Sequence, residues 1–324
     1  MQAVLCKAFG PPETLVLEEI AAPVAGPGEL LVDVAYVGLN FMDTLVIENK
    51  YQVKPPLPFS PGAEFSGTVR ASGAGVTGFA RGDRVAGFVG HGAARAQIAC
   101  PAAQMFALPD GLALDKAAGL TVSYGTSLHA LAQRARLQPG ETLAVLGASG
   151  GVGLAAVEIG AAMGARVIAC ASSPEKVAFA MRAGAATGID YSSGELKQAL
   201  RDATGGAGVD VIYDPVGGAL TEAALRAIAW AGRLLVIGFA GGGIPKIPLN
   251  LALLKSCDIL GVFWGEFARR NPEQNAANMA RIAQWVLEGR LSGHIHAVYP
   301  LAQVAEALGV LQRREAAGKV LLRV

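Results

Sequence analysis

The sequence predicts an α/β protein of two domains, in which a β-rich unit is followed by a doubly wound parallel sheet. The chain has 324 residues, a length typical of two domains. Hydrophobic residues make up 52% and aromatic residues only 6%, which suits buried parallel strands covered by helices. From Glu141 onward, short apolar runs alternate with helical stretches, the pattern of consecutive βαβ units.

The first hundred residues change direction often, as short strands separated by glycine do. A strand is predicted over residues 30–39, LLVDVAYVGL, and shorter strands are predicted within GAEFSGTVRASGAG and GDRVAGFV. Residues 114–135 then have the composition of a helix. These features predict a compact β-rich unit that ends in a helix.

The second half alternates regularly between strands and helices. Strands are predicted in ETLAVLG, ARVIACAS, VDVIYDPV (209–216), GRLLVIGFA and CDILGVFWG. Helices are predicted in GVGLAAVEIGAAMG, in SPEKVAFAMRAG, where Ser173 and Pro174 are a typical start, and in ALTEAALRAIAW. The chain ends with a helix at 273–289, the strand-like GHIHAVYPL, another helix and the strand GKVLLRV.

The charge and hydropathy of the chain argue against nucleic-acid and membrane partners. The net charge is only +1, so no basic surface is predicted. The N-terminus lacks the apolar core of a signal peptide, and no apolar run reaches the roughly 18 residues that a membrane span needs. We therefore expect a cytoplasmic protein.

Cysteines and histidines do not form a recognisable metal or redox motif. Four cysteines are far apart in the sequence and are expected to be ordinary buried thiols: Cys6, Cys100, Cys170 and Cys257. His294 and His296 lie on one face of a predicted strand, but no cysteine or carboxylate partner accompanies them.

A glycine-rich turn stands between a predicted strand and a predicted helix in LAVLGASGGVGLAAVEIG, residues 143–160. Ala148, Gly150 and Gly153 have the spacing of the dinucleotide-binding fingerprint G-x-G-x-x-G, with Ala in the first place. Gly150 lets the backbone approach a diphosphate, Gly153 lets the helix pack close to the strand, and the helix N-terminus offers free N–H groups. A tight turn without a ligand is the alternative.

The end of the next strand indicates NADPH rather than NADH. An NAD site usually has an acidic residue there, which binds the ribose 2′-hydroxyl group. The segment CASSPEK instead has Ser172, Ser173 and Lys176, which suit a 2′-phosphate, and Glu175 falls in the first turn of the following helix. The alternative is that Lys176 is an ordinary surface residue.

Several segments together resemble one known superfamily. They are GLNFMDTLVIENKY (38–51), PFSPGAEFSGTV (58–69), GDRVAGF, SYGTSLHAL (123–131), GASGGVG, SSPEKVAFAMRAGA, YDPVGG (213–218), GRLLVIGFAGG and GVFWG. On these segments the chain resembles the medium-chain dehydrogenase/reductase superfamily, in its zinc-free quinone oxidoreductase (zeta-crystallin-like) branch. The resemblance implies a GroES-like catalytic domain, residues 1–122 and 266–324, and an inserted Rossmann NADPH-binding domain, residues 123–265.

The resemblance also implies that no metal is bound. The zinc-dependent members hold catalytic zinc with two cysteines and a histidine, and here the matching positions are Asn40, Ala63 and Ala118. Glu64 is retained from the zinc members and is expected to form hydrogen bonds or an ion pair. Lys319 matches a family motif, and a structural role is one interpretation of this residue.

Without a metal, the expected chemistry is hydride transfer from NADPH to a quinone or to an alkene conjugated with a carbonyl group. Such an acceptor places negative charge on an oxygen, which hydrogen-bond donors must stabilise. Asn40 and Tyr51 are the catalytic candidates, because the resemblance places them at the substrate site. The alternatives are that Asn40 caps a turn and that Tyr51 and Tyr124 are packed with satisfied hydroxyl groups.

The resemblance implies further cofactor contacts and an assembly. Besides the fingerprint glycines and the residues Ser172, Ser173 and Lys176, the expected contacts are Tyr124, Thr126, Ala148, Ser149, Gly151, Val152, Tyr191, Phe239, Ala240, Phe263, Trp264 and Gly265, with Asn250 as a weaker candidate. CDILGVFWG is an apolar predicted edge strand, and the resemblance implies that it pairs with a second copy in a homodimer. The alternative is a monomer in which a loop covers this edge.

Three functions remain open at this point. The first is an NADPH-dependent quinone reductase, and the second is a reductase of conjugated enones, enals or enoyl thioesters. The third is an NADPH-binding protein with a non-catalytic role. The first two share one cofactor site, so the fingerprint does not separate them.

Overall fold

The computed structural model describes all 324 residues of the chain and divides into two compact units. Unit 1 contains Met1–Val122, Gly265–Glu288 and Gly293–Val324, and unit 2 contains Ser123–Trp264 and Gly289–Ser292. The boundaries therefore lie between residues 122 and 123, within a helix, between residues 264 and 265, and on both sides of the short segment Gly289–Ser292. No helix of the chain combines the length and the hydropathy that crossing a membrane requires.

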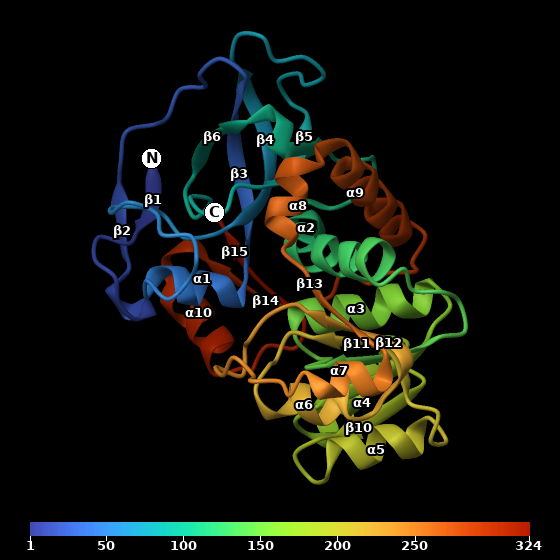
Figure 1. The fold of residues 1–324 in the computed structure, drawn as a ribbon. Coiled ribbons are helices and arrows are strands. Elements are labelled where there is room, and N and C mark those ends of the chain that lie inside the picture. Colours follow the sequence, from blue (N-terminus) through green and yellow to red (C-terminus); the bar gives the residue numbers. More distant parts are fainter. The chain divides into compact units, whose positions relative to one another are not determined.

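Unit 1 is built on a mostly antiparallel sheet (Figure 1). The strand order is β14-β15-β3-β4-β5-β7, and β6 also pairs with β3. The bounds are β3 Glu29–Leu39, β4 Glu64–Ser72, β5 Arg84–Phe88, β6 Gln97–Pro101, β7 Met105–Ala107, β14 Ile295–Pro300 and β15 Lys319–Arg323. Strands from both ends of the chain thus pair with one another, and the predicted strands at 30–39 and at GKVLLRV are confirmed.

Short elements complete unit 1. A separate two-stranded sheet consists of β1 Gln2–Leu5 and β2 Val16–Glu19. The helices are α1 Phe41–Ile47, α8 Trp264–Arg270, α9 Pro272–Leu287 and α10 Val304–Gln312, together with single turns at Pro12–Thr14, Ala102–Gln104 and Leu301–Gln303. The core is formed by apolar side chains from β3, β4 and β15 and from α1 and α10, and α1 packs against α10.

Unit 2 is built on a fully parallel sheet of six strands in the order β10-β9-β8-β11-β12-β13. The bounds are β8 Thr142–Leu146, β9 Arg166–Ala171, β10 Thr187–Asp190, β11 Val209–Asp214, β12 Ile228–Val236 and β13 Asp258–Gly261. The order reverses between β8 and β11, which is the topological switch point where such sheets bind ligands. The predicted doubly wound sheet is therefore confirmed, with β13 at its edge.

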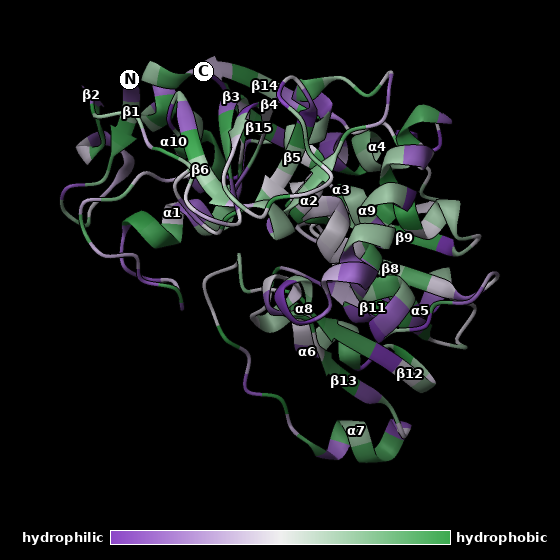
Figure 2. Ribbon diagram, turned by 90° about the horizontal axis from the view of Figure 1, so that it is seen from above, coloured by the Kyte–Doolittle hydropathy of each residue, from purple (hydrophilic) through white to green (hydrophobic).

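Helices lie on both faces of the unit 2 sheet (Figure 1). They are α3 Gly151–Ala162, α4 Pro174–Arg182, α5 Leu196–Ala203, α6 Ala219–Leu225 and α7 Asn250–Lys255. The unit begins within α2 Leu114–Leu128, which continues as a π-helical turn at His129–Arg134. Figure 2 shows the strands of this sheet largely in hydrophobic colours, as strands buried on both faces should be.

One predicted helix is shorter than the sequence suggested. The stretch ALTEAALRAIAW forms α6 only to Leu225, and β12 already begins at Ile228. Ile228 pairs with Val209, and the ladder then skips to Arg233, so the strand bulges over the intervening residues. Ala231 has a φ of 56° in this bulge, a left-handed conformation that a helix cannot contain.

Candidate functional site: a glycine turn and a buried polar cluster

In unit 2, the predicted cofactor residues gather at the carboxyl ends of the parallel strands. The fingerprint turn follows β8, Ser172 and Ser173 follow β9, and Tyr191 follows β10. Phe239 and Ala240 follow β12, and Phe263 follows β13. Because parallel strands end at one edge of a sheet, the topology brings these segments to the same edge.

The glycine turn is tight enough to require glycine at one position and open enough to admit a ligand at another. A Cβ on Gly153 would lie 2.1 Å from the Gly147 carbonyl oxygen, so no other residue fits there. A Cβ on Gly150, the N-cap of α3, would meet only that same oxygen, at 3.5 Å. The turn therefore leaves space in front of the first N–H groups of α3, which have no acceptor within the helix.

Two side chains that the sequence did not single out hold this turn in place. The Ser127 hydroxyl in α2 contacts the Val152 carbonyl oxygen at 3.0 Å and the Tyr213 hydroxyl at 2.9 Å. Burial raises the pKa of Tyr213 far above its usual range, so this phenol stays protonated. The bonds connect α2 and β11 to the first turn of α3.

Asp214, at the end of β11, orders the loop next to the switch point. Its buried carboxylate accepts hydrogen bonds from the N–H groups of Val216 and Gly217, at 2.8 and 2.9 Å, and from the Thr221 hydroxyl at 2.5 Å. This loop also pairs with the segment after β12, because Ala240 N–H donates to the Pro215 carbonyl at 3.0 Å. The aspartate in YDPVGG is the signal from which this role could have been predicted.

The residues expected at the 2′-phosphate form a local cluster at the start of α4. The Ser173 side chain accepts a hydrogen bond from Lys176 N–H at 3.3 Å, which confirms the predicted N-cap. Lys176 Nζ lies 3.4 Å from the Ser172 hydroxyl. A hydrogen bond from Ser173 lowers the pKa of Glu175, which lies in the first helical turn as expected.

The remaining predicted contacts have mixed environments. Tyr124 is buried, and its hydroxyl donates to the Glu158 carboxylate at 2.8 Å, as in the alternative in which it is packed and satisfied. Thr126 is also buried, and Trp264 packs on Gly125, whereas Phe263 is 59% exposed. Gly265 belongs to unit 1 and lies against Phe88.

A second arrangement, in unit 1, is a cluster of three buried polar side chains and one half-buried one, Asn40, that we call the Asn40 cluster: Asn40, Asp43, Glu64 and Lys319. Glu64 is 0% exposed and Lys319 is 5% exposed. Lys319 Nζ lies 2.5 Å from Glu64 Oε1 and 2.6 Å from Asn40 Oδ1. The expectation that Glu64 forms an ion pair is confirmed, and its partner is a lysine 255 residues away.

Sheet register explains why these distant residues meet. Gly38 in β3 pairs with Glu64 in β4 on one side and with Leu321 in β15 on the other. A Cβ on Gly38 would lie 2.8 Å from Glu64 Cγ, and one on Gly119 would lie 2.9 Å from Lys319 Cγ. Two glycines therefore make room for the stems of the two charged side chains.

The Asn40 amide is held from both ends. Its Oδ1 accepts from Lys319, and its Nδ2 donates to Glu64 Oε1 at 2.9 Å and to the Gly38 carbonyl at 3.4 Å. Asn40 is the N-cap residue of α1, but its side chain points to Glu64 and Lys319 instead of capping the helix. The other carboxylate oxygen of Glu64 accepts from Val122 N–H at 2.7 Å, so both of its oxygens are bonded.

Asp43 of the cluster and Tyr51 both have raised pKa values. The Asp43 carboxylate accepts from the N–H groups of Asn40 at 2.7 Å and Gly62 at 3.2 Å, yet burial raises its pKa to about 7. Tyr51 is half-buried against the unit 1 core, and its hydroxyl has no hydrogen-bond partner in the protein. Burial, and then the charge of Asp43, raise the pKa of Tyr51, which keeps the phenol protonated.

The donor set of the Asn40 cluster does not fit zinc. Asn40, Ala63 and Ala118 offer no thiolate or imidazole, and an ammonium group already neutralises Glu64. Across the chain, no three His, Cys, Asp or Glu side chains are grouped so that they could hold a metal ion. His296 instead accepts from Ala317 N–H at 3.3 Å, and all four cysteines are free and buried, as expected.

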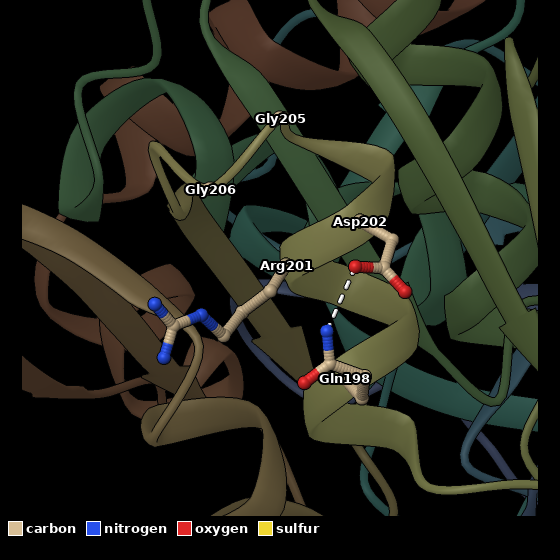
Figure 3. Close-up of a pocket in the computed structure, with 5 residues that line it drawn as sticks. All are labelled: Gln198, Arg201, Asp202, Gly205 and Gly206. Atoms are coloured by element: carbon tan, nitrogen blue, oxygen red, sulfur yellow. Dashed lines mark hydrogen bonds between the residues drawn. The ribbon is translucent and has the colours of Figure 1, made fainter.

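A surface hollow of about 470 Å³ lies at the C-terminal end of α5, away from every predicted residue. Gln198 in this hollow donates to Asp202 at 2.8 Å, and Arg201 points away from that pair (Figure 3). The hollow offers no convergent set of polar groups, so we assign no site to it.

Two segments of the chain match known protein families. Residues 26–110 match the alcohol dehydrogenase GroES-like domain, and residues 151–283 match the zinc-binding dehydrogenase family. The chain is 41% identical over 322 residues to rat quinone oxidoreductase-like protein 2, covering 99% of this chain and 91% of the relative.

Solved structures that are similar to this chain include two proteins complexed with NADPH. A mycobacterial protein complexed with NADPH is 30% identical, with a TM-score of 0.94 and full coverage of both chains. Quinone oxidoreductase from Escherichia coli, also complexed with NADPH, is 26% identical, with a TM-score of 0.93 and full coverage of both chains.

Proposed function

We propose that this chain, which belongs to the quinone oxidoreductase branch of the medium-chain dehydrogenase/reductase superfamily, reduces quinones with NADPH and without a metal ion. The observation that carries the proposal is the ion pair between Lys319 and Glu64. At the positions that the resemblance matches to zinc ligands stand Asn40, Ala63 and Ala118, and the Lys319 ammonium group neutralises the neighbouring Glu64. A quinone suits such a site, because it accepts hydride without a Lewis acid.

The glycine turn and the start of α4 would hold the cofactor. The first N–H groups of α3 have no acceptor within the helix and lie behind the space that Gly150 leaves open, so they would bind the diphosphate. Ser172, Ser173 and Lys176 would bind the 2′-phosphate, which favours NADPH over NADH. When bound, the nicotinamide supplies the hydride.

Tyr51 and Asn40 would act on the acceptor. The Tyr51 hydroxyl is free, and its raised pKa keeps the proton in place at neutral pH, so it is available to hydrogen-bond the acceptor oxygen and to deliver a proton there. One Asn40 N–H makes only a long bond of 3.4 Å to Gly38, so this donor is available to the same oxygen, while Lys319 and Glu64 keep the amide oriented.

The test is NADPH oxidation, followed at 340 nm with chelator-treated protein. The acceptors are 1,4-benzoquinone, 9,10-phenanthrenequinone, an enone and crotonyl-coenzyme A, and the series is repeated with NADH. We expect quinones with NADPH to turn over fastest. Faster turnover of the enone or thioester would replace the substrate class, and activity that chelation removes and zinc restores would refute the metal-free reaction.

Tyr51→Phe separates a catalytic from a packing role. We expect kcat to fall by about 10–100-fold while NADPH affinity stays the same, since a positioned proton donor contributes roughly that much. Tyr36→Phe, a half-buried tyrosine in β3, is the matched control and should leave kcat unchanged. Tight NADPH binding without turnover of any acceptor would instead favour a non-catalytic role.

We also propose a homodimer formed through the edge of the unit 2 sheet. β13 pairs only with β12, and the nearby chain exposes large apolar side chains: Leu249, Leu253, Leu254 and Phe263. Sedimentation velocity of the whole chain should give the mass of a dimer, and Leu253→Glu should shift it toward the monomer. An unchanged dimer in this variant would place the interface elsewhere.

A further inference from the structure

Unit 1 contains an open surface pocket of about 290 Å³, lined by two basic side chains and by several apolar ones. Pro56, Pro58, Phe59 and Ile98 line it together with His91 and Arg95. We call it the Arg95 pocket. None of these residues belongs to the Asn40 cluster or to the cofactor turn, and neither proposed reaction step uses them.

Arg95 is half-buried and has no counter-charge. One of its terminal nitrogens, Nη2, donates to the Ser60 hydroxyl at 2.9 Å, and this is its only side-chain hydrogen bond. Its Nε–H is buried and has no acceptor. Burial lowers the pKa of this guanidinium, and no carboxylate offsets that effect. A buried donor without a partner is unfavourable, so the fold holds this group in place at an energetic loss.

A comparison with a second arginine of the chain shows that Arg95 lacks a carboxylate partner. Arg233 in unit 2 likewise has a buried Nε–H without an acceptor. Its two terminal nitrogens, however, bind the Glu141 carboxylate at 2.9 and 2.7 Å. Arg95 has no equivalent carboxylate partner. A guanidinium group is well suited to bind a carboxylate through two parallel hydrogen bonds.

An aromatic ring and a neutral imidazole lie next to Arg95 in the pocket. The His91 ring meets the Phe59 ring edge-on, with centroids 5.9 Å apart. Burial and the Arg95 charge lower the pKa of His91, so the imidazole is neutral and the pocket carries one positive charge. The walls are rigid, because Gly92 and Ala94 donate backbone hydrogen bonds to Ser60 and Pro61 at 2.7 and 2.9 Å.

We propose that the Arg95 pocket binds a small monocarboxylate, whose charged group pairs with the terminal nitrogens of Arg95 and whose apolar body packs against Phe59, Pro58 and Ile98. One positive charge matches one carboxylate, and Pro58, Phe59 and Ile98 offer apolar contacts that a bare inorganic anion does not use. No residue of the pocket belongs to the proposed cofactor or acceptor residues, so this proposal does not depend on whether the chain reduces quinones.

Benzoate is the probe, and isothermal titration calorimetry of the whole chain with saturating NADPH is the measurement. We expect saturable binding with a Kd of about 0.1–1 mM, as suits a ligand of this size. Benzyl alcohol, which has the ring without the charge, should bind at least about 10-fold more weakly, because it lacks the charge-assisted bond. Inorganic phosphate should also bind more weakly than benzoate.

Variants test the assignment to Arg95. Arg95→Met should weaken benzoate binding by at least about 10-fold, and Arg95→Lys should fall between this variant and the natural chain. Arg70→Met is the matched control, because Arg70 is an exposed arginine of the same unit that contacts Asp33 at 3.3 Å, and benzoate binding should not change. His91→Phe should weaken binding less than Arg95→Met.

Several outcomes would overturn the proposal. They are equal affinity of the natural chain and Arg95→Met, equal affinity for benzoate and benzyl alcohol, or tighter binding of phosphate than of benzoate. If Arg95→Met does not fold, NMR of the natural chain decides, because benzoate must shift the ring signals of His91 and Phe59. Shifts confined to other residues would refute the site, and competition between benzoate and 9,10-phenanthrenequinone would show binding at the acceptor position instead.

Discussion

The two candidate sites of this protein differ in the groups that form them, which are backbone groups in one site and side chains in the other. The glycine turn in unit 2 consists of consecutive backbone groups, and its shape depends on the absence of side chains at Gly150 and Gly153. The Asn40 cluster in unit 1 consists of side chains from the start of α1, from β4 and from β15, and its charges are buried. A substitution in the turn should therefore affect ligand binding first, whereas a substitution in the cluster should affect stability first.

The largest effect is expected from removing the buried ammonium group. Lys319→Met leaves the fully buried Glu64 carboxylate without its partner, so we expect a loss of about 3–5 kcal/mol of unfolding free energy, measured by urea denaturation. The double variant Lys319→Met, Glu64→Gln should recover part of this loss, because it removes the unpaired charge. Equal stability of the natural chain and Lys319→Met would show that the pair is not buried in solution.

The next largest effect belongs to the turn. Gly153→Ala forces a Cβ to within 2.1 Å of the Gly147 carbonyl oxygen, so the turn must open, and we expect NADPH affinity to fall by about 100-fold. Gly150→Ala keeps the turn intact but places a methyl group where the diphosphate approaches, so a fall of about 10-fold is expected. Fluorescence titration with NADPH measures both. An unchanged affinity in Gly153→Ala would contradict the assignment of the turn.

The cluster should also make stability depend on pH. The pKa of Asp43 is about 7 in the folded chain, above its usual value of 3.8, so the folded state holds this proton more tightly than the unfolded chain does. Its contribution to stability is therefore present at low pH and is lost as the pH rises through about 7. Between pH 5.5 and 7.5 the natural chain should lose about 2 kcal/mol relative to Asp43→Asn. A difference that does not change with pH would refute the raised pKa.

The smallest effect is expected at the surface of the cofactor site. Lys176→Ala should weaken NADPH binding by about 10-fold and leave NADH binding unchanged, because only NADPH carries the 2′-phosphate. Lys197→Ala, which changes a partly buried lysine in α5, is the control. Equal weakening of both cofactors would show that Lys176 supports the fold of α4 and does not select the cofactor.

The cofactor turn and the parallel sheet could be predicted from the sequence because both depend on neighbours in the chain. Glycine spacing, Ser173 followed by Pro174, and apolar runs of strand length are local features, and the structure contains the predicted elements. The helix predicted through Trp230 was wrong because that prediction used local composition alone. The composition of the segment is helical, but Ile228 pairs with Val209, a residue of another strand, and this pairing makes the segment from Ile228 a strand.

The amino-acid pattern alone is enough to predict the two-part α/β fold, the fingerprint turn, and the absence of a thiolate or imidazole at Asn40, Ala63 and Ala118. Three-dimensional contacts were needed to find that Lys319 pairs with Glu64, that the Asn40 side chain points to both, and that Arg95 lacks a counter-charge. The two kinds of feature differ in how far apart their residues lie along the chain. Local patterns come from backbone geometry over a few residues, whereas a buried charge acquires its partner through strand register, which brings Lys319 to Glu64 across 255 residues.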